Sequence, residues 1–126
     1  MNLILAIVMG GSIGALARHY AVASAMRLWG ESFPYGTLIV NVVGSFVIGV
    51  LMETMAQKWQ VSLEMRAFLV TGVLGGFTTF SAFSFDVLKL VEAGQVVHAC
   101  IYVLLSVILS LAAVFAAVYF TRGVLA

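Results

Sequence analysis

Charged residues are scarce in this sequence, and the few that occur nearly cancel. Only 9% of the 126 residues are Asp, Glu, Lys or Arg, whereas roughly a quarter of an ordinary soluble domain is charged. Hydrophobic residues make up 63% of the chain. The formal net charge of +1 argues against nucleic acid as a partner, because a nucleic-acid-binding domain needs a basic surface. The composition excludes an ordinary soluble domain and favours a protein embedded in lipid.

Cysteine and the side-chain sets that carry catalysis are also missing. Cys100 is the single cysteine, so the chain has no internal disulfide, and a lone thiol in an apolar segment favours packing over chemistry. The sequence shows no Ser-His-Asp arrangement, no carboxylate pair placed for acid–base chemistry and no His/Cys set at metal-binding spacing. These absences argue against an enzyme.

Long apolar segments fill nearly all of the chain and predict an all-α membrane protein. A helix needs about 20 residues to cross a bilayer, so four spans and their loops consume residues 1–126 as a single membrane domain. The first segment lacks the basic start and the cleavage site of a signal peptide, and we expect it to be retained. The expected spans are residues 3–26, 36–56, 67–91 and 96–120.

Basic residues are divided evenly between the two sides of the predicted membrane domain. Orientation normally follows an excess of Lys and Arg on the cytoplasmic side, and this sequence has no such excess. The balance favours dual topology, in which copies insert both ways and pair as an antiparallel homodimer. The alternative is a weak charge signal that folding constraints override. The side of the termini carries Lys58, Arg66 and Arg122, and the other side carries Arg18, Arg27 and Lys89.

A stretch rich in glycine and threonine, residues 72–84, interrupts the third apolar segment. Glycine tolerates backbone angles that other residues resist, and threonine hydroxyls compete for backbone partners. A helix broken here leaves carbonyls free in the middle of the membrane, which is tolerated only where they face protein or a water-filled path. The stretch therefore predicts a break in the third helix and an ion site.

Polar side chains inside the expected spans are costly in hydrocarbon, so each one needs a reason. Arg18 is equally compatible with a cation that attracts anions at a vestibule and with a side chain that reaches the membrane interface. Asn41 favours a hydrogen bond between helices over a donor for a dehydrating anion. Asp86 lies toward the end of its span, where it helps to solvate the mouth of a pathway. A polar stripe on the last span recurs at every fourth residue and suggests a hydroxyl-lined path: His98, Tyr102, Ser106 and Ser110.

Phe80 and Phe83 fall on one face of the third span. Aromatic residues at this spacing usually pack in a core. The edge of a phenyl ring carries a partial positive charge, so a small anion can also lie against it. Together with the amide and hydroxyl donors, these rings favour a selective anion passage over catalysis.

Three sequence motifs occur together along the chain. They are GGSIGALAR at 10–18, PYGTLIVN at 34–41 with Gly44 just after it, and GGFTTFSAF at 75–83. The third motif is moderately specific alone and highly specific in combination with the other two. With this combination the sequence closely resembles the small fluoride channels of the Fluc, or CrcB, family over essentially its whole length.

This resemblance implies a channel that exports cytoplasmic fluoride passively across a bacterial inner (plasma) membrane, as a multi-pass protein among membrane lipids. It also implies an antiparallel homodimer with two fluoride pathways. The implied cofactor is a structural sodium ion, Na⁺, held at the subunit interface by the backbone carbonyls of Gly75 and Thr78. Arg18 is then the vestibule cation. The implied fluoride pathway consists of Asn41, Thr79, Phe80, Ser81, Phe83, Asp86, Tyr102, Ser106 and Ser110.

The sequence departs from the family pattern at two positions. Ala82 replaces the more usual threonine, which removes a hydroxyl from the third motif. His19 stands where an aromatic residue is more familiar, a change that bears on how the vestibule responds to pH.

Two other protein classes are alternatives. A small dual-topology multidrug transporter resembles this chain in size and span number, but it needs a membrane-embedded carboxylate, which residues 3–26 lack. A structural or assembly protein accounts for the glycine-rich helix faces. It explains neither Asn41 nor the polar stripe on the last span.

Overall fold

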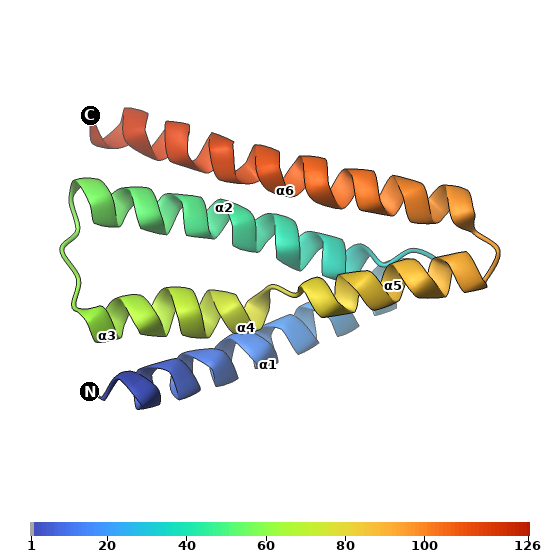
Figure 1. The fold of residues 1–126 in the computed structure, drawn as a ribbon, viewed down its shortest axis with the longest axis horizontal. Coiled ribbons are helices and arrows are strands. Elements are labelled where there is room, and N and C mark those ends of the chain that lie inside the picture. The colour runs from blue at the N-terminus through green and yellow to red at the C-terminus, as the bar shows by residue number, and fades with distance from the viewer. Residues whose placement is uncertain (1) are drawn as a thin grey trace.

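The regular secondary structure is helical throughout residues 2–126, the part of the chain described by its structure, a computed structural model. Four helices are long and apolar enough to cross a membrane, at Leu3–Trp29, Tyr35–Gln57, Leu63–Glu92 and Val96–Leu125. They confirm the four expected membrane helices. Figure 1 shows their elements, which are α1 (Leu3–Trp29), α2 (Tyr35–Gln57), α3 (Leu63–Arg66), the π-helix η1 (Ala67–Leu74), α4 (Gly75–Phe77), α5 (Phe80–Glu92) and α6 (Val96–Leu125).

Local capping explains where several helices begin and end. The Asn2 side chain accepts a hydrogen bond from the backbone N–H two residues later at 2.6 Å and begins α1. Gly30 follows the end of α1 with a φ of 80°, which suits glycine. The Ser62 hydroxyl accepts from the backbone N–H three residues later at 3.1 Å. The third membrane helix therefore begins at Leu63, earlier than the expected start at residue 67.

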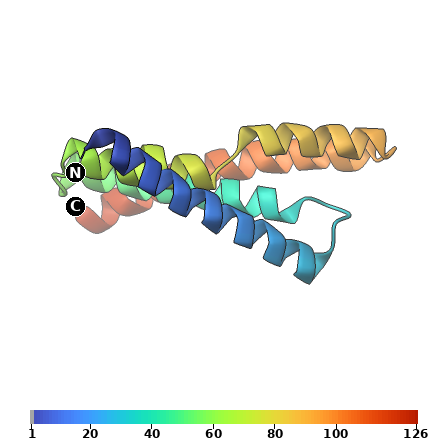
Figure 2. The ribbon, with the colours of Figure 1, turned by 90° about the horizontal axis from the view of Figure 1, so that it is seen from below.

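At the end of the molecule that carries both termini, the helices form one pair of α2 with α6 and another of α1 with the first half of the third membrane helix, and at the other end they form two different pairs (Figures 1 and 2). Near the termini, α1 packs against η1 and α4, and α2 packs along α6. Farther along, α1 stays with α2 and α5 stays with α6, and within residues 2–126 no close backbone approach joins α1 to α5. Figure 2 shows the resulting fork, whose two arms part where α4 gives way to α5.

Glycines allow α1 to lie close to the first half of the third membrane helix. A Cβ added at Gly10 would overlap the carbonyl oxygen of Phe68, and a Cβ at Gly14 would overlap the backbone of η1. On the facing side, a Cβ at Gly76 would lie 2.6 Å from the carbonyl oxygen of Gly11. The two backbones are therefore in contact, as small residues permit between membrane helices. This contact fixes α1 against the end of α4.

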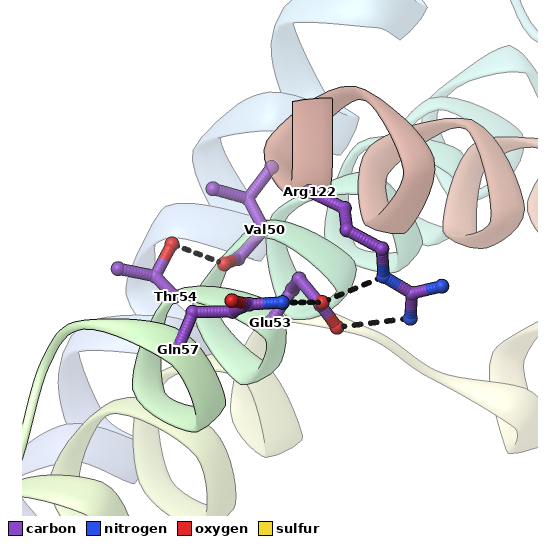
Figure 3. Close-up of polar contacts among 5 residues, drawn as sticks. All are labelled: Val50, Glu53, Thr54, Gln57 and Arg122. Atoms are coloured by element: carbon purple, nitrogen blue, oxygen red, sulfur yellow. Dashed lines mark hydrogen bonds and ion pairs between the residues drawn. The ribbon is translucent and has the colours of Figure 1, made fainter. Parts of the chain in front are cut away.

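An ion pair joins α2 to α6 near the end that carries the termini (Figure 3). Arg122 Nε lies 2.9 Å from Glu53 Oε1, and Arg122 Nη2 lies 3.4 Å from Glu53 Oε2. Gln57 Nε2 also donates to Glu53 Oε1, at 2.9 Å. Half of the Arg122 side chain is exposed, so solvent screening leaves the pair a small contribution to stability. The sequence analysis missed this pair, because 69 residues separate its members.

Candidate functional site

Two extended residues, Thr78 and Thr79, separate α4 from α5 and are called the junction below. Thr78 has φ −89° and ψ 157°, and Thr79 has φ −154° and ψ 124°. The Thr78 hydroxyl donates to the Leu74 carbonyl oxygen at 2.9 Å. The Thr79 hydroxyl accepts from the Ala82 N–H at 3.1 Å and begins α5. Each threonine side chain thus replaces or supplements the helical hydrogen bonding at the junction.

The Asn41 side chain on α2 pairs with the backbone of Thr79 through both ends of its amide. Asn41 Nδ2 donates to the Thr79 carbonyl oxygen at 2.9 Å, and Asn41 Oδ1 accepts from the Thr79 N–H at 2.8 Å. This pair is a hydrogen bond between helices, the interpretation of Asn41 that the sequence favours. An amide NH₂ has two hydrogens, and the pair uses one of them. Asn41 therefore holds the junction in place and keeps a second donor.

Arg18 on α1 contacts the junction from the other side. Its Nε donates to the Gly76 carbonyl oxygen at 3.0 Å. That carbonyl belongs to the last turn of a helical stretch, where acceptors lack helical partners and a cation is favourable. The side chain is half-buried and borders a cavity. Arg18 therefore both anchors α1 to the junction and brings positive charge beside it.

Two backbone carbonyls at the junction lose the donors that a continuous helix would give them. The N–H that would bond to the Gly75 oxygen belongs to Thr79, and Asn41 accepts it instead. The N–H that would bond to the Thr78 oxygen belongs to Ala82, and the Thr79 hydroxyl accepts it instead. Gly75 and Thr78 both belong to the lining of a cavity.

The cavity next to these carbonyls, called the inner cavity, has a volume of about 530 Å³ and only uncharged lining residues among those the structure describes. Ser106 is 7% exposed, and its Oγ has no hydrogen-bond partner within residues 2–126. Buried hydroxyls normally have a partner, so this oxygen is available to a guest in the cavity. The polar and aromatic residues of the lining are Asn41, Ser45, Thr78, Thr79, Phe80, Phe83, Ser106 and Ser110.

A second cavity, called the outer cavity, lies between the arms of the fork and has a volume of about 460 Å³. It is bordered by α1, the start of α2 and α5. Arg18 and Lys89 bring two formal positive charges to it and Asp86 one negative charge, with His19 as a further titratable group. The outer cavity therefore carries an excess of positive charge, which attracts anions.

Thr79 is the residue that the two cavities share, among the residues that the structure describes. It is the same residue whose backbone is paired with Asn41. A solute that moves from the charged cavity to the uncharged one would therefore pass the junction. The hydrogen bonds that hold Thr79 fix the geometry of this passage.

A row of aromatic rings runs from the inner cavity toward the loop between α1 and α2. The ring centroids of Phe80 and Phe83 lie 5.5 Å apart, those of Phe83 and Tyr102 5.1 Å, and those of Tyr102 and Phe33 5.5 Å. Tyr102 is fully buried. Its hydroxyl donates to Asp86 Oδ2 at 3.0 Å. Because Asp86 borders the outer cavity, this hydrogen bond connects the aromatic row to that cavity.

The residues expected in the fluoride pathway fall into four groups in the structure. Ser81 borders neither cavity, and its hydroxyl lies 3.3 Å from that of Thr79. The polar stripe on α6 divides, because His98 is exposed and borders neither cavity while Tyr102 lies in the aromatic row. Asp86 and the vestibule residue Arg18 border the outer cavity. The inner cavity brings together Asn41, Thr79, Phe80, Phe83, Ser106 and Ser110.

Three residues that border a cavity or belong to the aromatic row were not identified from the sequence as parts of a pathway. Thr37 on α2 is buried and borders the outer cavity, and Ser45 on the same helix borders the inner one. Phe33 packs edge-on against Tyr102 from the loop before α2, at an interplanar angle of 83°. Thr37 and Ser45 lie one helical turn before and after Asn41, which is the signal in the sequence that would have found them.

The fold and the site define a multi-pass helical membrane protein with polar cavities on either side of an interrupted helical segment. The chain belongs to the CrcB-like protein family, because the family described as CrcB-like protein, Camphor Resistance (CrcB), matches residues 5–118.

Relatives of known name are similar over most of the chain. The chain is 52% identical over 114 residues to the Fluoride-specific ion channel FluC of Agrobacterium fabrum (strain C58 / ATCC 33970), which covers 90% of this chain and 91% of that one. The proteins of the same name from Rhizobium johnstonii and Rhizobium meliloti are 54% and 48% identical, over 90% and 98% of this chain and 91% and 98% of their own. All three carry the name of an ion channel, which supports the argument against an enzyme.

Proposed function

We propose that this protein is a fluoride-specific ion channel through which fluoride leaves the cytoplasm of a bacterium, across the inner membrane and down its own gradient. The observation that carries the proposal is the order of the two cavities, one bearing cations and the next uncharged and lined by hydroxyls, with Thr79 shared between them. The identity of the ion comes from the names of relatives that are about half identical to this chain.

The two cavities have complementary tasks in this proposal. Arg18 and Lys89 raise the local concentration of anions in the outer cavity. Beyond Thr79, the unused Asn41 hydrogen and the hydroxyls of Ser106 and Ser110 replace the water around a small, strongly hydrated ion. Neutral donors hold an anion less tightly than a fixed cation does, so the ion can move on. The edges of Phe80 and Phe83 add partial positive charge along the same wall.

The proposal includes an antiparallel homodimer with two fluoride pathways. Phe80 borders the inner cavity and yet is 78% exposed in a single copy, so a second copy is needed to enclose the path. The even division of Lys and Arg supports insertion in both orientations.

Dual topology can be tested with one introduced cysteine. Gln95→Cys in a Cys100→Ser background places one thiol in the turn between α5 and α6. About half of the copies in sealed vesicles should react with a membrane-impermeant reagent added outside, because half of the turns face outward. Complete labelling or complete protection would contradict the antiparallel arrangement.

A structural sodium ion between the two copies is also part of the proposal. The carbonyl groups of Gly75 and Thr78 lack their helical donors and border the inner cavity, and carbonyls at unwound helix ends are suitable ligands for sodium. When bound, sodium would offset the partial negative charge of carbonyls from both copies. Replacing sodium with N-methylglucamine should shorten the lifetime of the dimer in detergent, measured by subunit exchange between two fluorescently labelled pools. An unchanged exchange rate would contradict the sodium site.

Fluoride efflux from liposomes tests the function itself. Vesicles that contain purified protein and potassium fluoride should release fluoride to an electrode when valinomycin balances the charge, and matched vesicles with potassium chloride should retain chloride. Release should persist without a proton gradient, because the proposed channel moves fluoride down its own gradient. Vesicles that retain fluoride would contradict the proposal. Release that requires a proton gradient would favour a coupled transporter.

A further inference from the structure

Two groups of hydroxyls in the membrane helices differ in their hydrogen bonding. Outside both groups, the buried Thr121 hydroxyl has no partner within residues 2–126 and lies in neither cavity lining. In the first group, the side-chain oxygen donates to the carbonyl oxygen four residues earlier in its own helix. Such a hydroxyl is satisfied within its own helix and has no donor left for a guest. This group contains Ser12 bonded to Val8 at 2.8 Å, Thr54 to Val50 at 2.7 Å (Figure 3), Thr78 to Leu74 at 2.9 Å and Ser84 to Phe80 at 3.0 Å.

The second group leaves its hydroxyl donors unused beside the inner cavity. Within residues 2–126, no hydrogen bond engages the hydroxyls of Ser45, Ser106 or Ser110, and all three residues border that cavity. For Ser106 the oxygen is buried as well. A buried donor without a partner costs free energy, so the Ser106 hydroxyl points to an occupant of the cavity, and the half-buried Ser45 and Ser110 present unused donors to the same space. Ser106 and Ser110 come from α6, whereas Ser45 comes from α2.

Ser45 lies one helical turn after Asn41 on the same face of α2. Gly44, between them in the sequence, brings this part of α2 against the junction, because a Cβ at Gly44 would overlap the methyl group of Thr78. The α2 side of the inner cavity therefore presents an amide donor and then a hydroxyl donor. The α6 side presents Ser106 and then Ser110 with the same four-residue spacing.

We infer that Ser45 is a further residue of the fluoride path, the hydroxyl donor on the α2 side of the inner cavity beyond Asn41. This inference rests on the proposed fluoride channel and adds to it a hydroxyl donor from α2, beside those that α6 supplies. A dehydrated fluoride ion in the inner cavity then receives hydroxyl hydrogen bonds from α2 as well as from α6. Donors from two sides replace a hydration shell more completely than donors from a single side.

The experiment compares fluoride efflux from liposomes for the wild type and three variants. Ser45→Ala removes the proposed donor and should slow efflux about tenfold, because one hydrogen bond to an ion is lost. Ser45→Thr keeps a hydroxyl and should restore most of the rate. Ser12→Ala is the matched control, because its hydroxyl donates to Val8 and borders neither cavity; its efflux should equal that of the wild type. Elution of each protein as one species in detergent confirms folding.

The outcomes separate the inference from the function on which it rests. If the wild type and Ser12→Ala release fluoride and Ser45→Ala does so at the same rate, Ser45 is not in the path. Equal slowing by Ser45→Ala and Ser45→Thr would also overturn the inference, because a retained hydroxyl would then make no difference. If Ser45→Ala does not fold, the test uses Ser45→Thr alone. An efflux rate of Ser45→Thr below one-tenth of the wild-type rate would then overturn the inference. Wild-type vesicles that retain fluoride would instead contradict the channel itself.

Discussion

The outer and inner cavities meet at Thr79 and differ in almost every other respect. The outer cavity lies between the arms of the fork and has arginine, lysine, histidine and aspartate in its lining. The inner cavity lies beside the junction, and its lining combines hydroxyls, one amide and two phenyl rings. Fixed charge gathers ions from solution but also retains them, whereas neutral donors satisfy an ion and release it. In the proposed channel, this difference assigns capture and passage to separate places along one chain.

The two cavities also differ in how their walls are held. Around the inner cavity, Asn41 pairs with Thr79, and Gly44 allows α2 to touch the junction. Around the outer cavity, α1 and α5 make no close backbone approach within the described residues, and Arg18 is the side chain that ties α1 to the end of α4. A rigid inner wall keeps donors at fixed positions, which selective recognition requires. The outer cavity needs only to concentrate anions.

The largest expected effect comes from Asn41→Asp, which replaces the amide that pairs with the Thr79 backbone by a negatively charged carboxylate. A carboxylate has no N–H for the Thr79 carbonyl and repels both that oxygen and an approaching anion. Fluoride efflux should fall by about a hundredfold or more, since two unfavourable contacts together exceed roughly 3 kcal/mol. Asn2→Asp is the matched control, because aspartate caps a helix as well as asparagine does. Normal efflux from Asn41→Asp would remove Asn41 from the account.

The next largest effect is expected for Phe83→Ile, which removes a ring edge from the inner cavity. The variant keeps an apolar side chain but loses the partial positive charge of the ring, and efflux should slow about tenfold or more. Phe80→Ile should act in the same way. Phe115→Ile serves as the control, because Phe115 is exposed and lies in neither cavity lining. Fluoride efflux at the wild-type rate from both Phe83→Ile and Phe80→Ile would show that the rings only fill space.

A smaller effect, on stability, is expected where α1 meets the first half of the third membrane helix. Gly14→Ala places a methyl group into the backbone of η1 and should destabilise the protein by about 1–3 kcal/mol. Gly11→Ala is the matched control, because a Cβ at that position meets nothing within 4 Å. Thermal unfolding in detergent measures the difference. A Gly11→Ala variant that loses as much stability as Gly14→Ala would contradict the close contact.

The smallest effect is expected far from both linings, at the ion pair between α2 and α6. Arg122→Gln removes the charge that contacts Glu53. Because half of the Arg122 side chain is exposed and the pair borders neither cavity, efflux should stay within about twofold of the wild type. A clear loss of efflux would mean that this end of the bundle also controls the path, and the division of tasks between the two cavities would then be incomplete.

The sequence predicts much of this arrangement for physical reasons. Four apolar segments of sufficient length have to become membrane helices, and the structure confirms them. The glycines and threonines of residues 72–84 indicate an irregular segment, and the structure has two extended residues there. Asn41 in an apolar helix indicates a partner on another helix, because an unpaired amide in hydrocarbon is costly.

Other features depend on contacts between residues far apart in the chain. The hydrogen bond from Arg18 to the Gly76 carbonyl joins positions 58 residues apart. The π-helix η1 consists of apolar residues that an ordinary α-helix would accept equally well. Whether a serine bonds to its own helix or turns to a cavity depends on how the helices pack. For this reason Ser12 and Ser45 look alike in the sequence and differ in the structure.

The dependence of the fluoride efflux rate on fluoride concentration tests the division between capture and passage most directly. Lys89→Gln removes a charge from the outer cavity and should raise the half-saturating concentration severalfold while the maximal rate is kept. Ser106→Ala removes a donor from the inner cavity and should lower the maximal rate about tenfold with little change in the half-saturating concentration. If both variants change the same parameter, the two cavities do not perform separate tasks, and the account is wrong.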